Sequence, residues 1–352
     1  MTFPWRPAGF YSAIRKADVA DDGDDDRKRL EDLGKRLEAR FRRAFIEYVQ
    51  RITDEATIKA MVDLISQGRV NEAIGYLDQF ADRFGEDFAE AFREAAKEEM
   101  AAQAPRAVAA MEASPYVPNP VRVEVTFGGG NPRAAEAART EGARLVQEIS
   151  EPTREVVQQV VSNGLSQGAG PREFARELRS SLGLTDKQNA AVANYERLLR
   201  AGSKEALTRE LRDKRSDGPV LRAAEGGKPL TEDQIGRMVE AYRRKYLKYR
   251  TENIARTEAL QAASLGRIEG MRQTLESLDL TTNDVEKTWS TSVDGRERRT
   301  HRLMNGQKVK GLDAQFQSPG GARLRFPRDP AGPADEVVMC RCAFTFRITI
   351  GE

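Results

Sequence analysis

Apolar residues spaced three and four apart constrain the fold of this chain most strongly, because they recur over most of its length. The first stripe runs through Leu30, Leu33, Leu37, Phe41, Phe45, Tyr48 and Ile52. This spacing places the apolar side chains on one face of an amphipathic helix. Similar patterns follow up to about residue 112 and again from about residue 131 to 282. The sequence therefore predicts a mainly α-helical protein.

The pattern changes after about Asn283, where alternation of apolar and polar residues replaces the helical spacing. Val285 to Thr291 has the pattern of a strand, with Trp289 expected to be buried, and Phe344 to Ile350 alternates as a terminal strand does. Glycine-containing pairs between them, such as Asn305-Gly306, are turn signals. We predict a small α+β domain at the C-terminal end.

Proline, glycine and charge patterns along the chain divide it into four segments. We expect a flexible acidic arm at 1–26, an N-terminal helical region at 27–112, a strand and then a helical body with a long helix at 113–282, and the C-terminal α+β domain at 283–352. The strand of the third segment is predicted at 121–127 by alternation of valine and phenylalanine with polar residues.

Individual helix boundaries follow from proline and capping patterns. Pro105 is expected to break the first helical region, and Pro152 to start a new helix. Capping boxes are predicted where Thr185 precedes Gln188 and where Thr231 precedes Gln234, the latter opening the long helix. The stretch 215–230, rich in glycine and charge, is expected to be a loop.

The net charge of the chain does not indicate which class of partner it binds. The chain has 57 basic and 55 acidic residues, a formal net charge of +2, so no overall field attracts nucleic acid or anionic lipid. Residues 27–51 are locally basic, with nine basic and four acidic side chains, and either contact phosphates or an acidic protein or form a solvated helix face. No stretch reaches the ~20 apolar residues of a membrane span, so we expect no membrane partner.

Histidine and cysteine are scarce and lie close together in the sequence. The one histidine, His301, and the two cysteines, Cys340 and Cys342, all lie within 301–342. A disulfide between two cysteines one residue apart is strained and joins nothing distant, which favours a reducing compartment. The N-terminal residues contain no apolar core of a secretory signal, so synthesis in a cytoplasm is expected.

These residues leave two chemical alternatives beside a purely structural role. His301, Cys340 and Cys342 have the donor atoms of a zinc site, with Asp294 as a fourth candidate ligand, although Cys-x-Cys spacing is not diagnostic. A cysteine activated by His301 would instead be the centre of a hydrolase. In the structural alternative, His301 is a hydrogen-bonded core residue and Arg341 points to a carboxylate such as Asp294.

An ordered set of residues near the C-terminus resembles a known signature. The set comprises Arg256, Thr257, Glu258, Asp294, Arg296, His301, Gly306, Pro327, Cys340, Arg341 and Cys342. It is similar to the C-terminal motif of the Mu-F-like minor head proteins of tailed bacteriophages, including its Cys-Arg-Cys ending. The resemblance covers residues 250–347 well and the helices from about 131 loosely; it does not extend to residues 1–110.

The resemblance implies a minor capsid or head-morphogenesis protein of a phage or prophage. Such a protein docks on the portal and on capsid or scaffold proteins, is found in the virion at the head interior or portal vertex, and assembles in the host cytoplasm. The resemblance implies no catalytic centre and no cofactor. Zinc remains an alternative only because of the donor atoms of His301, Cys340 and Cys342.

Some relatives are linked to packaged double-stranded DNA, so a DNA packaging or ejection factor is the alternative function. Its candidate contacts are Arg298, Arg299, Arg302, Lys308 and Lys310. The third candidate function is that of a metalloenzyme or hydrolase centred on His301 and the two cysteines. Some relatives carry a toxin domain after the motif; here the sequence continues for ten residues after Cys342, so we expect none.

Overall fold

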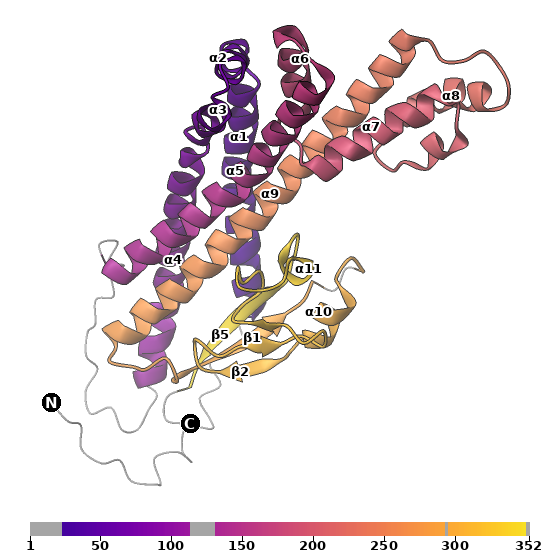
Figure 1. Ribbon diagram of the computed structural model, residues 1–352. Helices are drawn as coiled ribbons and strands as arrows, with labels where there is room; N and C mark the ends of the chain where they lie inside the picture. The colour runs from indigo at the N-terminus through magenta and orange to yellow at the C-terminus, as the bar shows by residue number, and fades with distance from the viewer. Residues whose placement is uncertain (1–22, 113–130, 293–294, 350–352) are drawn as a thin grey trace. The chain divides into compact units, whose positions relative to one another are not determined.

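The computed structural model describes residues 23–112, 131–292 and 295–349 and confirms a mainly α-helical chain with a few short antiparallel strands near its C-terminal end (Figure 1). The predicted strand at 121–127 and most of the predicted acidic arm lie outside these residues. The chain forms two compact units. Among the described residues, unit 1 comprises 23–41, 86–112, 131–142, 255–292 and 295–349, and unit 2 comprises 42–85 and 143–254.

The helices account for most of the described residues. They are α1 (Gly23–Ile52), α2 (Glu55–Ser66), α3 (Val70–Asp78), α4 (Asp82–Glu112), α5 (Pro132–Gln167), α6 (Pro171–Ser181), α7 (Asp186–Arg200), the short 3-10 helices η3 (Lys204–Thr208) and η4 (Lys214–Ser216), α8 (Asp217–Ala224), α9 (Glu232–Ser277), α10 (Arg299–Met304) and α11 (Ala334–Val337). The strands are β1 (Val285–Ser290), β2 (Lys308–Lys310), β3 (Phe316–Gln317), β4 (Arg323–Leu324) and β5 (Ala343–Ile348).

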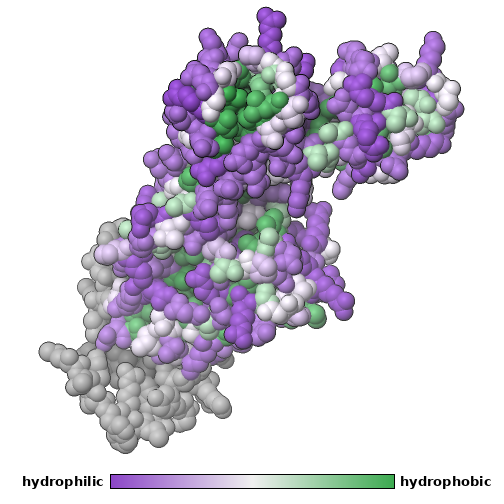
Figure 2. Space-filling model, viewed as in Figure 1, coloured by the Kyte–Doolittle hydropathy of each residue, from purple (hydrophilic) through white to green (hydrophobic). Residues whose placement is uncertain are grey.

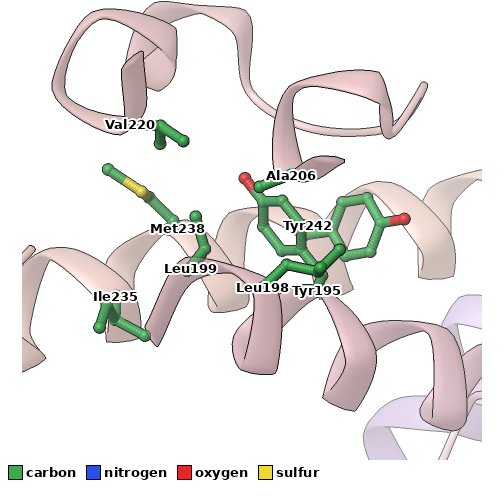
Figure 3. Packing of buried hydrophobic residues seen from close by; sticks show 8 residues of the cluster. All are labelled: Tyr195, Leu198, Leu199, Ala206, Val220, Ile235, Met238 and Tyr242. Carbon is green, nitrogen blue, oxygen red and sulfur yellow. The ribbon is translucent and has the colours of Figure 1, made fainter. Parts of the chain in front are cut away.

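In unit 2, one hydrophobic cluster joins α7, η3, α8 and the first turns of α9 (Figure 3). Tyr195 and Tyr242 stack with ring centroids 4.3 Å apart, and Tyr246 packs edge-on against Tyr242. The tyrosines at 242 and 246 are therefore packing residues, whereas Tyr249, one turn further on, is 48% exposed. Both predicted capping boxes, at Thr185 and at Thr231, are present as reciprocal hydrogen bonds.

Three boundary predictions are wrong, for related reasons. Pro105 and Pro152 lie inside α4 and α5 and do not interrupt them. A proline inside a helix costs about 3 kcal/mol, and burial of neighbouring apolar residues on both sides, such as Ala104 and Ala107 around Pro105, offsets that cost. The predicted loop 215–230 contains α8, because Val220 is buried in the unit 2 cluster.

In unit 1, an antiparallel three-stranded sheet has the order β2-β1-β5, and β3 pairs with β4. On β1, Val285, Lys287 and Trp289 face the interior, which confirms the predicted burial of Trp289. Val285 packs with the end of α9 and with Phe344 and other residues in one hydrophobic cluster, and Trp289 packs with both cysteines in a second. Strand β1 thus contributes both to the cluster at the end of α9 and to the cluster that contains the cysteines.

A buried ionic network ties the helices of unit 1 to its sheet. Arg267 on α9 is 2% exposed; its Nε donates to Glu99 Oε2 on α4 at 2.7 Å, and its Nη1 donates to the backbone oxygen of Phe344 on β5 at 3.0 Å. Its Nη2 lies 3.7 Å from Asp26 Oδ2 on α1. The helix α1 begins at Gly23, earlier than predicted, and Asp26 is buried within this network.

Close backbone approach between α4 and α9 depends on glycines of α9. A Cβ atom at Gly266 would lie 2.4 Å from the carbonyl oxygen of Phe92 and 2.6 Å from Ala95 Cβ, and one at Gly270 would lie 2.4 Å from the carbonyl oxygen of Ala96. These contacts are with backbone and a short side chain, so neither neighbour can rotate away. The α4–α9 packing in unit 1 therefore requires glycine at both positions.

Gly266→Ala is expected to lower the free energy of unfolding of unit 1 by about 1–3 kcal/mol, the usual cost of overpacking a well-filled core. Gly236→Ala, in the same helix, is the matched control, since a Cβ there meets nothing within 4 Å. That variant should be neutral or more stable by up to about 1 kcal/mol, the helix-propensity difference between the two residues. Urea unfolding measures both, and equal stabilities of the two variants would contradict the packing argument.

Hydrophilic residues cover most of the face seen in Figure 2, and hydrophobic residues gather in one patch near the top of the view and in smaller groups elsewhere. Among the described residues, no helix combines the length and apolar character needed to cross a bilayer.

Candidate metal centre

The structure brings together the three scarce residues singled out in the sequence. His301 Nδ1 lies 3.4 Å from Cys340 Sγ and 3.4 Å from Cys342 Sγ. His301 comes from α10, and the two cysteines lie between α11 and β5. All three side chains are buried, with residue exposures of 1%, 1% and 3%. One imidazole nitrogen therefore faces two sulfur atoms inside unit 1.

The backbone around the cysteines is held from the interior by two residues. Arg328 is fully buried and its Nη1 donates to the carbonyl oxygens of Cys340, at 3.1 Å, and Cys342, at 2.5 Å, while its Nη2 donates to Ser264 Oγ on α9 at 2.9 Å. Thr257 Oγ1, also on α9, accepts a hydrogen bond from the backbone N–H of Met339 at 3.2 Å. The loop that carries the cysteines is thus fixed against α9.

Glu336 orients the imidazole from its other side. Its Oε2 lies 2.7 Å from His301 Nε2 and accepts from Thr300 Oγ1 at 3.0 Å, and its Oε1 accepts from Ser318 Oγ at 2.6 Å. Because a carboxylate only accepts hydrogen bonds, we assign the proton of a neutral His301 to Nε2. The unprotonated Nδ1 then carries its lone pair toward the two sulfur atoms.

The charges around the site favour ionised ligands. Burial alone raises the pKa of the Cys340 thiol, but hydrogen bonding to Cys342 and His301 and the positive charge of Arg328 outweigh it and hold this pKa well below its ordinary value. The hydrogen bond with Cys340, together with burial, raises the pKa of Cys342. Burial also raises the pKa of Glu336, but hydrogen bonds from Ser318 and Thr300 and the nearby His301 lower it below its ordinary value.

Within the described ranges, His301, Cys340 and Cys342 form a group that can hold a metal ion, since their donor atoms all lie within 4.8 Å of one another. Imidazole and thiolate are good ligands for transition metals. The fourth candidate, Asp294, lies outside the described residues.

A small surface pocket reaches this cluster. It is lined by Ser292, Arg296, Glu297, Arg298, His301, Met339, Arg341 and Cys342. Of these lining residues, Glu297 pairs with Arg302 at 2.8 Å, and Arg298 donates to the backbone oxygen of Val338. The pocket includes two of the three candidate ligands, His301 and Cys342.

Several residues of the sequence motif have local structural roles. Arg256 Nε lies 3.4 Å from Glu38 Oε2 on α1, and Glu258, two positions on, is buried. Gly306 has φ of 79°, which favours glycine, and its N–H donates to the backbone oxygen of Trp289 at 2.8 Å. Pro327 is buried next to Arg328. The backbone oxygen of Arg341 accepts a hydrogen bond from Ser292 Oγ at 3.1 Å.

The candidate DNA contacts come from two elements, and three of them have partners within the protein. Arg298, Arg299 and Arg302 lie at or next to α10, whereas Lys308 and Lys310 lie on β2. Arg302 pairs with Glu297 at 2.8 Å and Lys308 with Glu286 at 3.0 Å, and Arg298 donates to the backbone oxygen of Val338.

The basic face of α1 is engaged in a similar way. In unit 1, Arg36 and Arg40 pair with glutamates of α4, including Glu94 at 3.6 Å and 3.5 Å respectively. These residues belong to the locally basic stretch 27–51, so part of that stretch is neutralised by protein carboxylates.

Two residues at the centre of the site were missed in the sequence analysis. Arg328, rather than Arg341, supports the two cysteines, and Glu336 orients His301. A carboxylate four residues before Cys340 was the one available signal for Glu336. For Arg328 the sequence offers no signal, because its left-handed backbone (φ 69°) and full burial depend on the tertiary fold.

No family model, curated protein or solved structure matches this chain.

Proposed function

We propose that the chain is a non-catalytic head component of a tailed phage or prophage, which docks on the portal and on capsid or scaffold proteins during head assembly. The observation that carries the proposal is the ordered motif from Arg256 to Cys342, whose described members lie within unit 1. A motif whose residues lock α9 to a small sheet suits a rigid docking unit.

The burial of the Cys–His cluster supports a role without catalysis. A nucleophilic cysteine needs one activated thiolate that substrate can reach, whereas here Cys340 is 1% exposed and its backbone is held by Arg328. In addition, two sulfur atoms lie at the same 3.4 Å from one imidazole nitrogen. A symmetric pair of this kind suits a shared ligand better than a single attacking atom.

The proposal is tested by locating the protein in assembled particles. Procapsids and mature heads are purified from induced cells of the strain that encodes the chain, and their proteins are quantified by mass spectrometry. We expect the chain in procapsids at a fixed ratio to portal subunits, and fewer filled heads when its gene is deleted. Its absence from both particle types would contradict the proposal.

We also propose that the ion bound at the cluster is zinc. A tetrahedral zinc ion with Zn–S of about 2.3 Å and Zn–N of about 2.0 Å separates the nitrogen from each sulfur by about 3.5 Å, close to the 3.4 Å of both His301–cysteine pairs. Two thiolates and one imidazole favour zinc over hard cations such as Mg²⁺. Glu336 then completes the carboxylate–histidine–zinc arrangement common in such sites.

Glu336→Gln is expected to weaken zinc binding about 10–100-fold, the usual effect of removing a carboxylate that orients a histidine ligand. The full chain, carrying one zinc ion when prepared without chelators, is titrated against a competing chromophoric chelator. Glu286→Gln is the matched control, because Glu286 on β1 pairs with Lys308 and does not contact the cluster. Equal zinc affinity of the two variants would exclude the assigned role of Glu336.

A further inference from the structure

We infer that the outward face of α10 is a docking surface, and that it receives an acidic protein surface that also carries an apolar side chain. This basic–apolar surface consists of Arg298, Arg299, Arg302, Leu303 and Val338. The inference rests on the proposed head-assembly function, to which it adds a contact surface and the chemistry of the partner. It does not depend on the proposed zinc ion.

The helix α10 presents one face to the interior and the other to solvent. His301 and Met304 are each 1% exposed, and Thr300 Oγ1 donates to Glu336 Oε2 at 3.0 Å. The outward positions are exposed, and they are Arg299, Arg302 and Leu303. A helix of six residues is not stable by itself in water. The inward contacts therefore hold in place the helix that carries the outward side chains.

Apolar exposure in unit 1 is concentrated at α10. Seven large apolar side chains are well exposed among the described residues, and five of them belong to unit 2. The two in unit 1 are Leu303, which is 65% exposed, and Val338, which is 40% exposed. Arg298, the residue before α10, donates to the backbone oxygen of Val338. Single exposed apolar residues are ordinary, but two that adjoin one charged helix indicate a contact surface.

The charge of the same surface is positive. Residues 294–303 contain four arginines and two acidic residues. The described acidic residue, Glu297, pairs with Arg302 at 2.8 Å, but its side chain is 4% exposed whereas that of Arg302 is 60% exposed. Arg299 is exposed and forms no ion pair with a described residue. The surface therefore attracts carboxylates, which arginine binds in a bidentate geometry.

The exposed leucine favours a protein partner over DNA. Most contacts with DNA are made to phosphates and sugars by charged and polar side chains, and Leu303 adds nothing to contacts of that kind. Protein interfaces instead combine an apolar core with a polar rim and are enriched in arginine. The partner that fits is a protein surface on which carboxylates lie beside an apolar side chain.

Procapsids that lack the chain provide the binding assay. They are purified from cells in which its gene is deleted, and the purified full chain is added at increasing concentration and measured by co-sedimentation. Arg299→Glu should weaken binding by about tenfold or more, because it places like charges opposite each other. Arg299→Lys keeps the charge and should bind within about threefold of the unchanged chain.

The apolar contact is tested separately. Leu303→Gln should weaken binding about tenfold, equivalent to about 1.4 kcal/mol, because apolar area is no longer buried on docking. Arg323→Glu and Leu221→Gln are the matched controls, since Arg323 is an exposed arginine of β4 and Leu221 an exposed leucine of α8 in unit 2. Both controls should bind like the unchanged chain. Equal urea midpoints confirm that every variant is folded.

The outcomes separate this inference from the proposed function. No binding of the unchanged chain to these procapsids overturns both. Binding that Arg299→Glu and Leu303→Gln leave unchanged overturns the inference alone. Tighter binding of Arg299→Glu overturns the acidic character of the partner. Double-stranded DNA is titrated in parallel, and a loss of DNA binding by Arg299→Glu with binding to procapsids intact assigns the surface to DNA and overturns the protein partner.

Discussion

Arg267→Met is expected to lower the free energy of unfolding of unit 1 by about 3–5 kcal/mol, the usual result of removing one partner from a buried ion pair. The substitution keeps much of the side-chain volume but leaves Glu99 and Asp26, which are 3% and 1% exposed, without their buried cation. It also leaves the carbonyl oxygen of Phe344 without this donor. Contact of the guanidinium with the Phe344 ring, at 4.8 Å from its centroid, is lost as well.

Trp289 provides a local probe for this measurement. The chain has two tryptophans, Trp5 and Trp289, so a Trp5→Phe background leaves fluorescence that reports on unit 1 alone. Arg272→Met is the matched control, because Arg272 lies on the same helix and its partner Asp313 is largely exposed. An exposed pair contributes about 0–1 kcal/mol. Similar urea midpoints for the two variants would show that the buried network does not stabilise unit 1.

Removal of zinc is expected to lower the free energy of unfolding of unit 1 by about 4 kcal/mol when free zinc is 1,000-fold above its dissociation constant. An ion held as proposed by His301, Cys340 and Cys342 would join α10 to the segment before β5, so its loss would remove a link between parts of the chain about 40 residues apart. Because Trp289 packs against His301, its fluorescence should report the change directly.

The comparison for zinc removal uses the chain with and without a chelator in the Trp5→Phe background. A variant with serine at positions 340 and 342 serves as control, since its stability should not depend on chelator. Unit 2 contains neither cysteine, so it should unfold at the same urea concentration in all samples. An unchanged fluorescence transition on chelation would contradict a stabilising ion.

Periodic patterns in the sequence predicted the helices and the two longer strands well, because amphipathic spacing reports directly on which residues are buried. Capping boxes at Thr185 and Thr231 were also predictable, since they depend on residues three apart. Pro105 and Pro152 misled the prediction because the packing that offsets their local cost involves residues distant in the sequence.

The candidate metal ligands could be predicted from the sequence, but the residues that hold those ligands in place could not. Scarcity alone singled out His301, Cys340 and Cys342, which the structure brings together. Arg328 and Glu336 escaped because charged residues are expected at the surface, and only the tertiary fold buries them. Lys287 is a similar case: it lies on the buried face of β1, donates to the carbonyl oxygens of Ala314 and Arg325, and has its pKa lowered by burial to about 7.

Binding to a portal protein encoded in the same genome tests the proposed function most directly. The zinc-loaded chain is titrated against assembled portal and followed by analytical ultracentrifugation at 50 mM and 200 mM salt, roughly the range over which DNA-binding proteins with 6–10 phosphate contacts lose about 10³–10⁵ in affinity. We expect a complex of fixed stoichiometry at both salt concentrations. No complex with portal, together with tight and steeply salt-dependent binding to double-stranded DNA, would contradict the docking function and favour a DNA-engaging factor.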